Sequence, residues 1–177
     1  DFSDRMLAVA RGRRAQASDS RARTTLTFLR GDALRTPFPD EAFDAVTISY
    51  GLRNLENCEA GLREMLRVLR TAGRLVVLDF GKPDNALWRA GYFNYLRWFV
   101  PCFGRVFCGD PATYGYILES LRHYPAQRGV AALMKKMDCE DVRILNLMGG
   151  VMSINYGVKG RRPPKAPKPF SETHPSP

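Results

Sequence analysis

Short apolar runs alternate with a helical repeat of apolar residues along the first half of the chain. The runs DAVTIS, residues 44–49, and RLVVLDF, residues 74–80, have the length and continuity of strands buried on both faces of a parallel sheet. Between them, leucines and a methionine at helical spacing predict a helix over 57–70, which Gly73 is expected to terminate. Residues 23–29, RTTLTFL, have the β-branched and aromatic composition of a further strand.

The rest of the pattern predicts more helices and a closing hairpin. Residues 142–159 contain two strand-like runs joined at Gly149-Gly150. Helices are expected over 3–15, 111–124 and 125–137. Strands and helices alternating at this spacing are typical of βαβ units. We therefore predict an α/β fold with a mostly parallel sheet, helices on its faces and a C-terminal antiparallel hairpin.

Residues 88–107 are unusually rich in aromatic side chains. Eight of these twenty residues are Phe, Tyr or Trp, on a mostly helical spacing. One interpretation is a core helix that covers the sheet. The other is the wall of an apolar pocket or a membrane-contact surface. The two interpretations are compatible, and the sequence leaves both open.

Polar residues follow the predicted strands. They are Asp1, Gly31 to Ala33, Ser49 to Asn54, and Asp79 to Gly81. Ligands of parallel sheets bind outside the carboxyl ends of the strands, so these segments are expected to be neighbours along one edge. Taken singly, each is also an ordinary loop start, because Gly, Asp, Ser and Asn are common in turns.

The composition and charge describe one soluble globular domain. The 177 residues are 45% apolar and 25% charged, and no apolar run approaches the ~20 residues that cross a bilayer. Residues 11–23 hold five Arg and one Asp, and residues 159–177 hold five Lys or Arg and one Glu. Together these segments contribute +8 of the net charge of +9. The charge therefore does not form the basic face of a nucleic-acid-binding protein.

The cysteines and the start of the chain favour an intracellular protein without a metal site. Cys58, Cys102, Cys108 and Cys139 form no CxxC pair and have no nearby His, so neither a zinc site nor a disulfide framework is predicted. The opening DFSDRMLAVA does not have the pattern of a signal or transit peptide and looks like the interior of a domain.

Seven stretches of the chain match the pattern of a known family. They are DFSDRML, GDALRTPFPDEAFDAVTISYGLRN, LREMLRVLR, GRLVVLDFGKP, VPCFGR, GDPATYGYILESLRHYP and LMGGVMSINYGVK. YGLRN, the FGKP element and the Y-x-Y-x-x-x-S segment together are characteristic. Through them, residues 1 to about 159 resemble the ubiquinone/menaquinone biosynthesis C-methyltransferase family. The resemblance implies a class I, Rossmann-like methyltransferase fold. In that fold a closing antiparallel hairpin ends the parallel sheet, and this hairpin distinguishes it from dehydrogenase domains.

The resemblance also predicts the limits of the domain. The family begins with a strand and a Gly-rich loop that approaches the methionine end of the cofactor, and nothing precedes Asp1 here. We therefore expect residues 1–158 to be an N-terminally truncated methyltransferase domain. Residues 159–177 are expected to be a disordered, basic, Pro-rich tail. Thr71-Ala72-Gly73 replaces the family's Pro-Gly-Gly turn, a departure at a helix exit.

The resemblance implies methyl transfer from S-adenosylmethionine to a ring carbon of a polyprenylated benzoquinol or naphthoquinol, on the way to ubiquinone or menaquinone. The alternative is a non-catalytic remnant that binds lipid or serves as a scaffold in a quinone-synthesis complex. Expected partners are the quinol, a second copy of the chain or that complex, and a membrane surface touched by the segment around Trp88 to Phe107. The family lies on the matrix side of the mitochondrial inner membrane in eukaryotes and in the cytoplasm of bacteria.

The family pattern implies four cofactor contacts. Asp1 matches the acidic residue that accepts hydrogen bonds from the ribose hydroxyls, as a carboxylate can. Asp32 and Ala33 match the contact on the adenine side. Ser49 matches a contact at a strand end, near the amino-acid part of the cofactor.

The stretch ISYGLRN carries the predicted catalytic residues. A ring carbon becomes nucleophilic when the adjacent phenol loses its proton, and a nearby positive charge favours that phenolate. Arg53 is assigned this electrostatic role, since an arginine that stays protonated is a poor base, and Asn54 is assigned to orientation. Gly51 is expected to let the chain turn. A surface salt bridge of Arg53 with Glu56 or Glu59 is the alternative.

Five residues are predicted on the substrate side through the family pattern. They are Tyr50, Asp110, Tyr114, Tyr116 and Glu119. Tyr114 and Tyr116 are two residues apart and cannot share a helical face, so we expect at most one of them to face the ligand. The family has no His at position 123, and a surface or capping role is expected for His123.

Overall fold

The computed structural model describes residues 3–16, 26–103 and 112–161. None of the helices in these ranges is long and apolar enough to span a membrane. The elements are α1 (Asp4–Gln16), β1 (Phe43–Ser49), the 3₁₀ turn η1 (Leu52–Asn54), α2 (Cys58–Val68), β2 (Leu69–Phe80), α3 (Ala86–Asn94), the π-helical turn η2 (Tyr95–Phe99), α4 (Val100–Phe103), α5 (Ala112–His123), α6 (Ala126–Lys136), β3 (Cys139–Leu147), the 3₁₀ turn η4 (Met148–Gly150) and β4 (Met152–Lys159).

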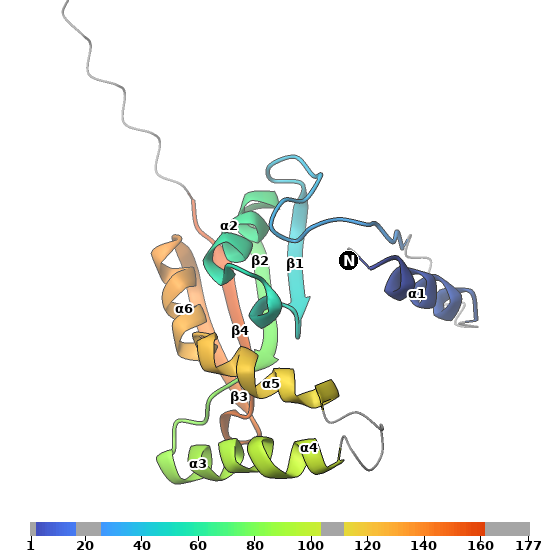
Figure 1. Ribbon diagram of the computed structural model, residues 1–177. Helices are drawn as coiled ribbons and strands as arrows, with labels where there is room; N and C mark the ends of the chain where they lie inside the picture. The colour runs from blue at the N-terminus through green and yellow to red at the C-terminus, as the bar shows by residue number, and fades with distance from the viewer. Residues whose placement is uncertain (1–2, 17–25, 104–111, 162–177) are drawn as a thin grey trace, which may run out of the picture.

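The described strands form one sheet in the order β1-β2-β4-β3 (Figure 1). β1 and β2 are parallel, and Ser49 at the end of β1 lies opposite Leu78 of β2. β4 is antiparallel to both β2 and β3, so the closing hairpin places its second strand between them. Three of the four strands therefore run in one direction, which confirms the predicted mostly parallel sheet with a C-terminal antiparallel hairpin.

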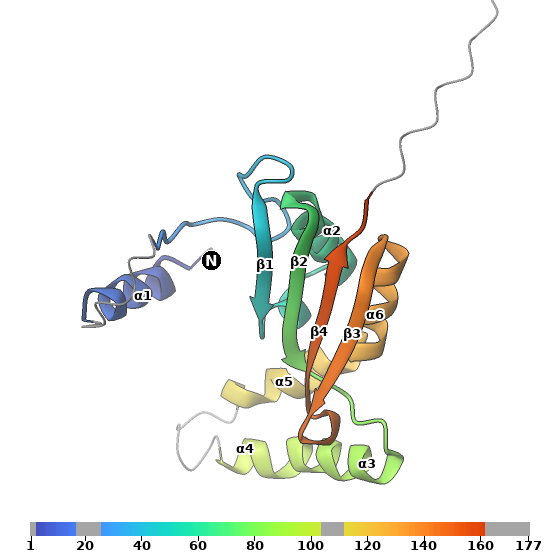
Figure 2. The ribbon, with the colours of Figure 1, turned by 180° about the vertical axis from the view of Figure 1, so that it is seen from behind.

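The helices are placed in two groups. α2 and α6 cover one face of the sheet and stand in front of it in Figure 1 and behind it in Figure 2. α5 and the segment formed by α3, η2 and α4 lie beyond the carboxyl ends of β1 and β2. The ends of these two strands are therefore near helices, although Ser49 at the end of β1 is exposed.

Side-chain caps explain where three of the helices begin. Ser3 accepts a hydrogen bond from the amide of Met6 at 3.3 Å, as the sequence predicts for the first helix. Asn57 caps α2 by accepting from Ala60 at 2.9 Å, and Asn85 caps α3 by accepting from the amide of Trp88 at 3.0 Å.

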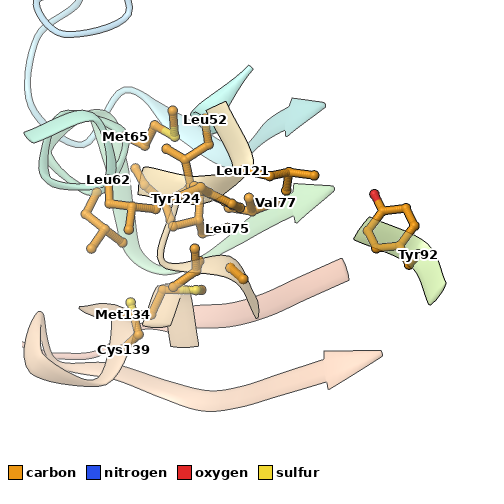
Figure 3. Packing of buried hydrophobic residues seen from close by; sticks show 14 of the residues in the cluster. Leu52, Leu62, Met65, Leu75, Val77, Tyr92, Leu121, Tyr124, Met134 and Cys139 are labelled. Carbon is orange, nitrogen blue, oxygen red and sulfur yellow. The ribbon is translucent and has the colours of Figure 1, made fainter. Parts of the chain in front are cut away.

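The core fills the space between the sheet and the helices (Figure 3). Leucines that are completely buried dominate it, which is where apolar burial stabilises the fold most. Its members are Leu52, Leu62, Met65, Leu66, Leu69, Leu75, Val77, Tyr92, Leu96, Leu121, Tyr124, Ala126, Val130, Met134 and Cys139.

Over the residues that the structure describes, the aromatic segment is partly core and partly exposed, which confirms its core role and leaves membrane contact a prediction. Tyr92 and Leu96 are buried in the core. Leu87, Trp88, Tyr95, Trp98 and Phe99 are half or more exposed. Residues 104–107 lie outside the described ranges.

The prediction of a strand over residues 23–29 is wrong for the part that the structure describes. Residues 26–29 have no regular structure, and 23–25 lie outside the described ranges. β-branched residues favour extended backbone, but a strand is stable only when it pairs with another. No described strand pairs with the outer edge of β1. Nearby, the backbone forms only an isolated bridge between Asp32 and Arg35.

The predicted helix stop at Gly73 is also wrong. α2 ends at Val68, and the chain continues at once as β2. Gly73 lies within that strand and is buried; a Cβ there would be 2.7 Å from Leu69 Cδ1 and 2.8 Å from the Arg70 carbonyl oxygen. The register with β1 jumps from Leu69 to Arg74, so Thr71-Ala72-Gly73 forms an irregularity in the strand.

β1 is not buried on both faces, contrary to expectation. Its residues are exposed or half-buried, because it is an edge strand among the described residues and has a neighbour on one side only. β2, in the interior of the sheet, alternates between buried and more exposed positions over its second half.

Candidate active site

The chain leaves β1 through a short turn that presents the side chains of residues 50–54. The amide of Tyr50 donates to the Leu78 carbonyl at 2.8 Å, which extends the pairing one residue beyond the strand. Tyr50, with φ of 52°, makes the left-handed turn, while Gly51 has an ordinary φ of −113°. The prediction that Gly51 allows the turn is wrong. A Cβ at Gly51 would be 3.1 Å from the Ile48 side chain, so close packing accounts for the glycine.

Arg53 is buried and paired with Asp79 across the ends of β1 and β2. The side chains are 2% and 1% exposed, and Arg53 Nε lies 3.5 Å from Asp79 Oδ1. The Arg53 amide donates to Asp79 Oδ2 at 3.1 Å. The guanidinium carbon lies 4.9 Å from the centre of the Phe80 ring. The alternative prediction for Arg53, a surface salt bridge with Glu56 or Glu59, is therefore wrong, because the guanidinium points into the protein.

Asn54 holds the guanidinium in place. Its Oδ1 accepts from Arg53 Nη1 at 3.1 Å, and its Nδ2 donates to the Tyr50 carbonyl at 3.2 Å. The same carbonyl accepts from Arg53 Nη1 at 3.5 Å. Asn54 thus fixes the direction of the Arg53 guanidinium, and its role toward a substrate stays a prediction.

Asp79 is the electrostatic partner of Arg53, and it is not among the site residues predicted from the sequence. Burial raises the pKa of its carboxyl above the usual range, although the amides of Arg53 and Phe80 and the charge of Arg53 act in the opposite direction. The Phe80 amide donates to Asp79 Oδ1 at 2.8 Å. Asp79 is recognisable in the sequence as a polar residue ending an apolar strand, but its partner across the sheet is not.

Two further ionisable groups lie near Asp79 and were missed. Burial, with the charge of Asp79, raises the pKa of the Cys58 thiol to about 11. Burial also raises the pKa of Tyr124 well above its usual range, and again Asp79 contributes. Both groups stay protonated near neutral pH. In the sequence both residues stand among apolar positions, so nothing distinguished them from ordinary core residues.

The predicted cofactor residues are only partly described. Asp1 lies outside the described residues. Ser49 is exposed at the end of β1. Asp32 and Ala33 lie in a turn, where Asp32 Oδ1 accepts from the Leu34 amide at 2.9 Å. This turn does not follow a strand. Of the four polar segments expected along one edge of the sheet, only those after β1 and β2 follow a described strand.

The predicted substrate residues have different surroundings. The Tyr50 hydroxyl donates to Met152 Sδ at 3.0 Å, and its ring lies 5.2 Å from that of Phe80. Glu119 is exposed on α5 and pairs with Arg122 at 3.2 Å and with His123 at 3.7 Å. His123 is itself a surface residue, as predicted. Tyr114 and Tyr116 belong to α5, and Asp110 lies outside the described residues.

The loop after β2 is held by a buried glutamine that sequence reasoning also missed. Gln127 accepts from the Lys82 amide at 2.9 Å and donates to the Lys82 carbonyl at 2.8 Å. Its own carbonyl accepts from Asn155 Nδ2 at 2.8 Å. A Cβ on Gly81 would lie 2.5 Å from the Gly150 carbonyl oxygen. The FGKP element is therefore locked between α6 and the hairpin turn.

A pocket of about 570 Å³ opens beside this loop, between α3 and the end of α5. Its lining residues are Lys82, Ala86, Arg89, Ala90, Phe93 and Arg122. Neither Arg53 nor Asn54 is among them, so the pocket is separate from the predicted catalytic pair. The described residues contain no group of His, Cys, Asp and Glu side chains that would hold a metal ion.

Comparison with protein families places the chain among methyltransferases. The model of the ubiE/COQ5 methyltransferase family matches residues 1–159. The ubiquinone/menaquinone biosynthesis C-methyltransferase UbiE of Ectopseudomonas mendocina is 40% identical over 90% of the chain. A demethylmenaquinone methyltransferase of Beutenbergia cavernae is 43% identical over 90% of it. The matches cover 61% and 62% of these proteins, so the chain spans about three fifths of the length of the curated relatives.

Solved structures agree on the fold. A methyltransferase dependent on S-adenosylmethionine from Thermotoga maritima, described as a possible histamine N-methyltransferase, superposes with a TM-score of 0.60. It is 20% identical, and the match covers 90% of this chain and 71% of that one. A methyltransferase of the same dependence from Aquifex aeolicus superposes with a TM-score of 0.57, at 15% identity, over 90% of this chain and 66% of that one. The class I methyltransferase fold is therefore confirmed.

Proposed function

Because the chain belongs to the ubiE/COQ5 methyltransferase family, we propose that it transfers a methyl group from S-adenosylmethionine to a ring carbon of a polyprenylated quinol. The observation that carries this proposal is Arg53, whose guanidinium is buried at the carboxyl ends of β1 and β2 and oriented by Asp79 and Asn54. Ligands of parallel sheets bind at such strand ends. The names of the relatives, which concern ubiquinone or menaquinone biosynthesis, support the quinol as substrate.

The chemistry needs a fixed positive charge next to a phenol oxygen. The phenol gives its proton to water, and the resulting phenolate, with negative charge on its oxygen, makes the ring carbon nucleophilic. That carbon forms a bond to the methyl carbon as the S–CH₃ bond breaks and S-adenosylhomocysteine leaves, and the ring carbon then loses its own proton to water. A guanidinium in a site shielded from water stabilises the phenolate charge more than it would in solution, and its planar donors do not have to reorganise. The ring of Phe80, 4.9 Å from the guanidinium carbon, keeps one face of Arg53 apolar.

The cofactor is proposed to contact Ser49, Asp32 and Ala33 together with Asp1. Ser49 is the candidate that the fold supports best, since its hydroxyl is exposed at the end of a parallel strand. A hydroxyl there donates to or accepts from the amino-acid part of the ligand.

Titration of the 177-residue chain with S-adenosylmethionine by calorimetry tests this proposal. We expect micromolar binding, weakened about tenfold by Ser49→Val through the loss of one hydrogen bond. Thr47→Val, in the same strand two residues earlier, is the control and should bind as the unchanged chain does. Absence of binding would reject the proposed cofactor site if extension with the family's N-terminal strand and Gly-rich loop does not restore it, and would then leave the remnant hypothesis, which the comparisons do not support.

The exposed aromatic residues of α3 and η2 are proposed to rest on a membrane that contains the quinol. Trp88 and Trp98 are 51% and 67% exposed, and Arg97 lies over the Trp98 ring at 5.3 Å. Tryptophan with a nearby cation suits the interface between lipid and water. The compartment is also part of the proposal. From the location of the family, it is a mitochondrial or a bacterial membrane surface.

Vesicle co-sedimentation tests the membrane contact. The double variant Trp88→Ser plus Trp98→Ser is expected to lose most binding to vesicles of anionic and zwitterionic phospholipid, because it removes the largest exposed apolar groups. Leu26→Ser plus Leu29→Ser, also exposed but located between α1 and β1, is the matched control. Equal binding of both variants would refute this contact surface.

A further inference from the structure

Tyr92 carries a buried hydroxyl that the fold does not use. The side chain projects from α3 and is 6% exposed. Its ring packs edge-on against Phe93, with centroids 5.7 Å apart. Among the described residues the hydroxyl has no hydrogen-bond partner. A donor taken out of water without a partner costs free energy, and native proteins retain few such groups.

The other tyrosines near this region do not have this property. The Tyr50 hydroxyl donates to Met152 Sδ at 3.0 Å. Tyr95, three residues after Tyr92 on the same helical segment, is 50% exposed and reaches solvent. The unused donor is therefore particular to Tyr92 and is not a general consequence of the aromatic composition.

The position of Tyr92 connects it to the catalytic arginine. In Figure 3 the residue lies apart from the other core side chains, beyond the end of β2, and its hydroxyl points away from α3. Arg53 lies at the same strand end, where it pairs with Asp79. Burial raises the pKa of Tyr92 to about 12, and the charge of Arg53 acts in the opposite direction. Tyr92 therefore keeps its proton, and remains a donor, at every physiological pH.

We propose that the Tyr92 hydroxyl donates a hydrogen bond to the oxygen of a phenolic ring bound beside Arg53 at the end of β2. The assignment of that phenol as the methyl acceptor rests on the proposed function. Arg53 supplies the positive charge, and Tyr92 supplies a neutral donor that favours the ionised oxygen without giving up its proton. The bound ligand would thus provide the partner that the hydroxyl lacks among the residues that the structure describes.

The test compares Tyr92→Phe with Tyr95→Phe in the 177-residue chain, with 4-nitrophenol as a probe whose colour reports its ionisation. Tyr92→Phe is expected to weaken binding of the probe about tenfold and to shift ionisation of the bound probe to higher pH, because one donor to the phenolate is lost. The melting temperature should stay the same or rise, since the variant removes an unpaired buried group. Tyr95→Phe should change none of these three quantities.

Three results would overturn the inference. They are unchanged probe affinity in Tyr92→Phe, absence of probe binding by the unsubstituted chain, and a melting temperature lowered by several degrees in Tyr92→Phe. The last would mean that the hydroxyl has a partner within the fold. Binding that depends on Tyr92 without any methyl transfer to a demethylated quinol would reject the proposed function while leaving the phenol site in place.

Discussion

Replacing Arg53 with alanine is expected to lower methyl transfer on the order of 100-fold, the effect of removing a charge that stabilises a developing oxyanion. It should also destabilise the fold by about 3–5 kcal/mol, because Asp79 would remain buried without its partner. Affinity for S-adenosylmethionine in the fraction that stays folded is expected to be nearly unchanged. Initial rates, calorimetry and urea unfolding measure the three quantities.

The double variant Arg53→Met plus Asp79→Leu separates the two roles of Arg53. Replacing both charges with apolar side chains of similar volume should restore most of the stability, as often happens for buried ion pairs, and should restore no activity. Recovery of activity in this variant would contradict the electrostatic role. A large loss of cofactor affinity in folded Arg53→Ala would instead move Arg53 to the cofactor site.

Replacing Gln127 with alanine is expected to destabilise the fold by about 3 kcal/mol, since the half-buried amide and carbonyl of Lys82 would both lose their partner and a cavity would form. The loop of Gly81 to Pro83 follows Asp79 and Phe80 directly, so we also expect Asp79 to hold Arg53 less firmly and, on the proposed function, a reduced rate of methyl transfer. Urea unfolding gives the change in stability.

The neighbouring residue offers a matched control for Gln127. Arg128→Ala removes an exposed ion pair with Asp84, 2.8 Å long, and should cost less than about 1 kcal/mol. Equal costs for the two substitutions would show that the Gln127 contacts with Lys82 do not hold the loop.

The local elements were predictable because their signals lie within a few neighbouring residues. Apolar continuity located β1 and the second half of β2, and the two runs around Gly149-Gly150 located the hairpin. The boundaries that failed lacked such local support. Residues 26–29 have strand-like composition but pair with none of the described strands, and the end of α2 was decided by pairing of Leu69 with β1 and not by the glycine that follows.

The candidate site shows the same division. Arg53 and Asn54 were predictable from the family motif, and the structure confirms that they lie together. Asp79, 26 residues further along the chain, was visible only as one polar strand end among several. Tyr92 and Gln127 looked like ordinary members of helices.

The sequence by itself thus determined the order of strands and helices, the family, and the motif that carries Arg53 and Asn54. The tertiary structure alone decided that Asp79 pairs with Arg53, that Gln127 holds Lys82 45 residues away, and that the Tyr92 hydroxyl is buried beyond the end of β2. The reason is physical. Periodicity and capping act over a few residues of chain, whereas burial and ion pairing depend on which distant segments the folded sheet brings together.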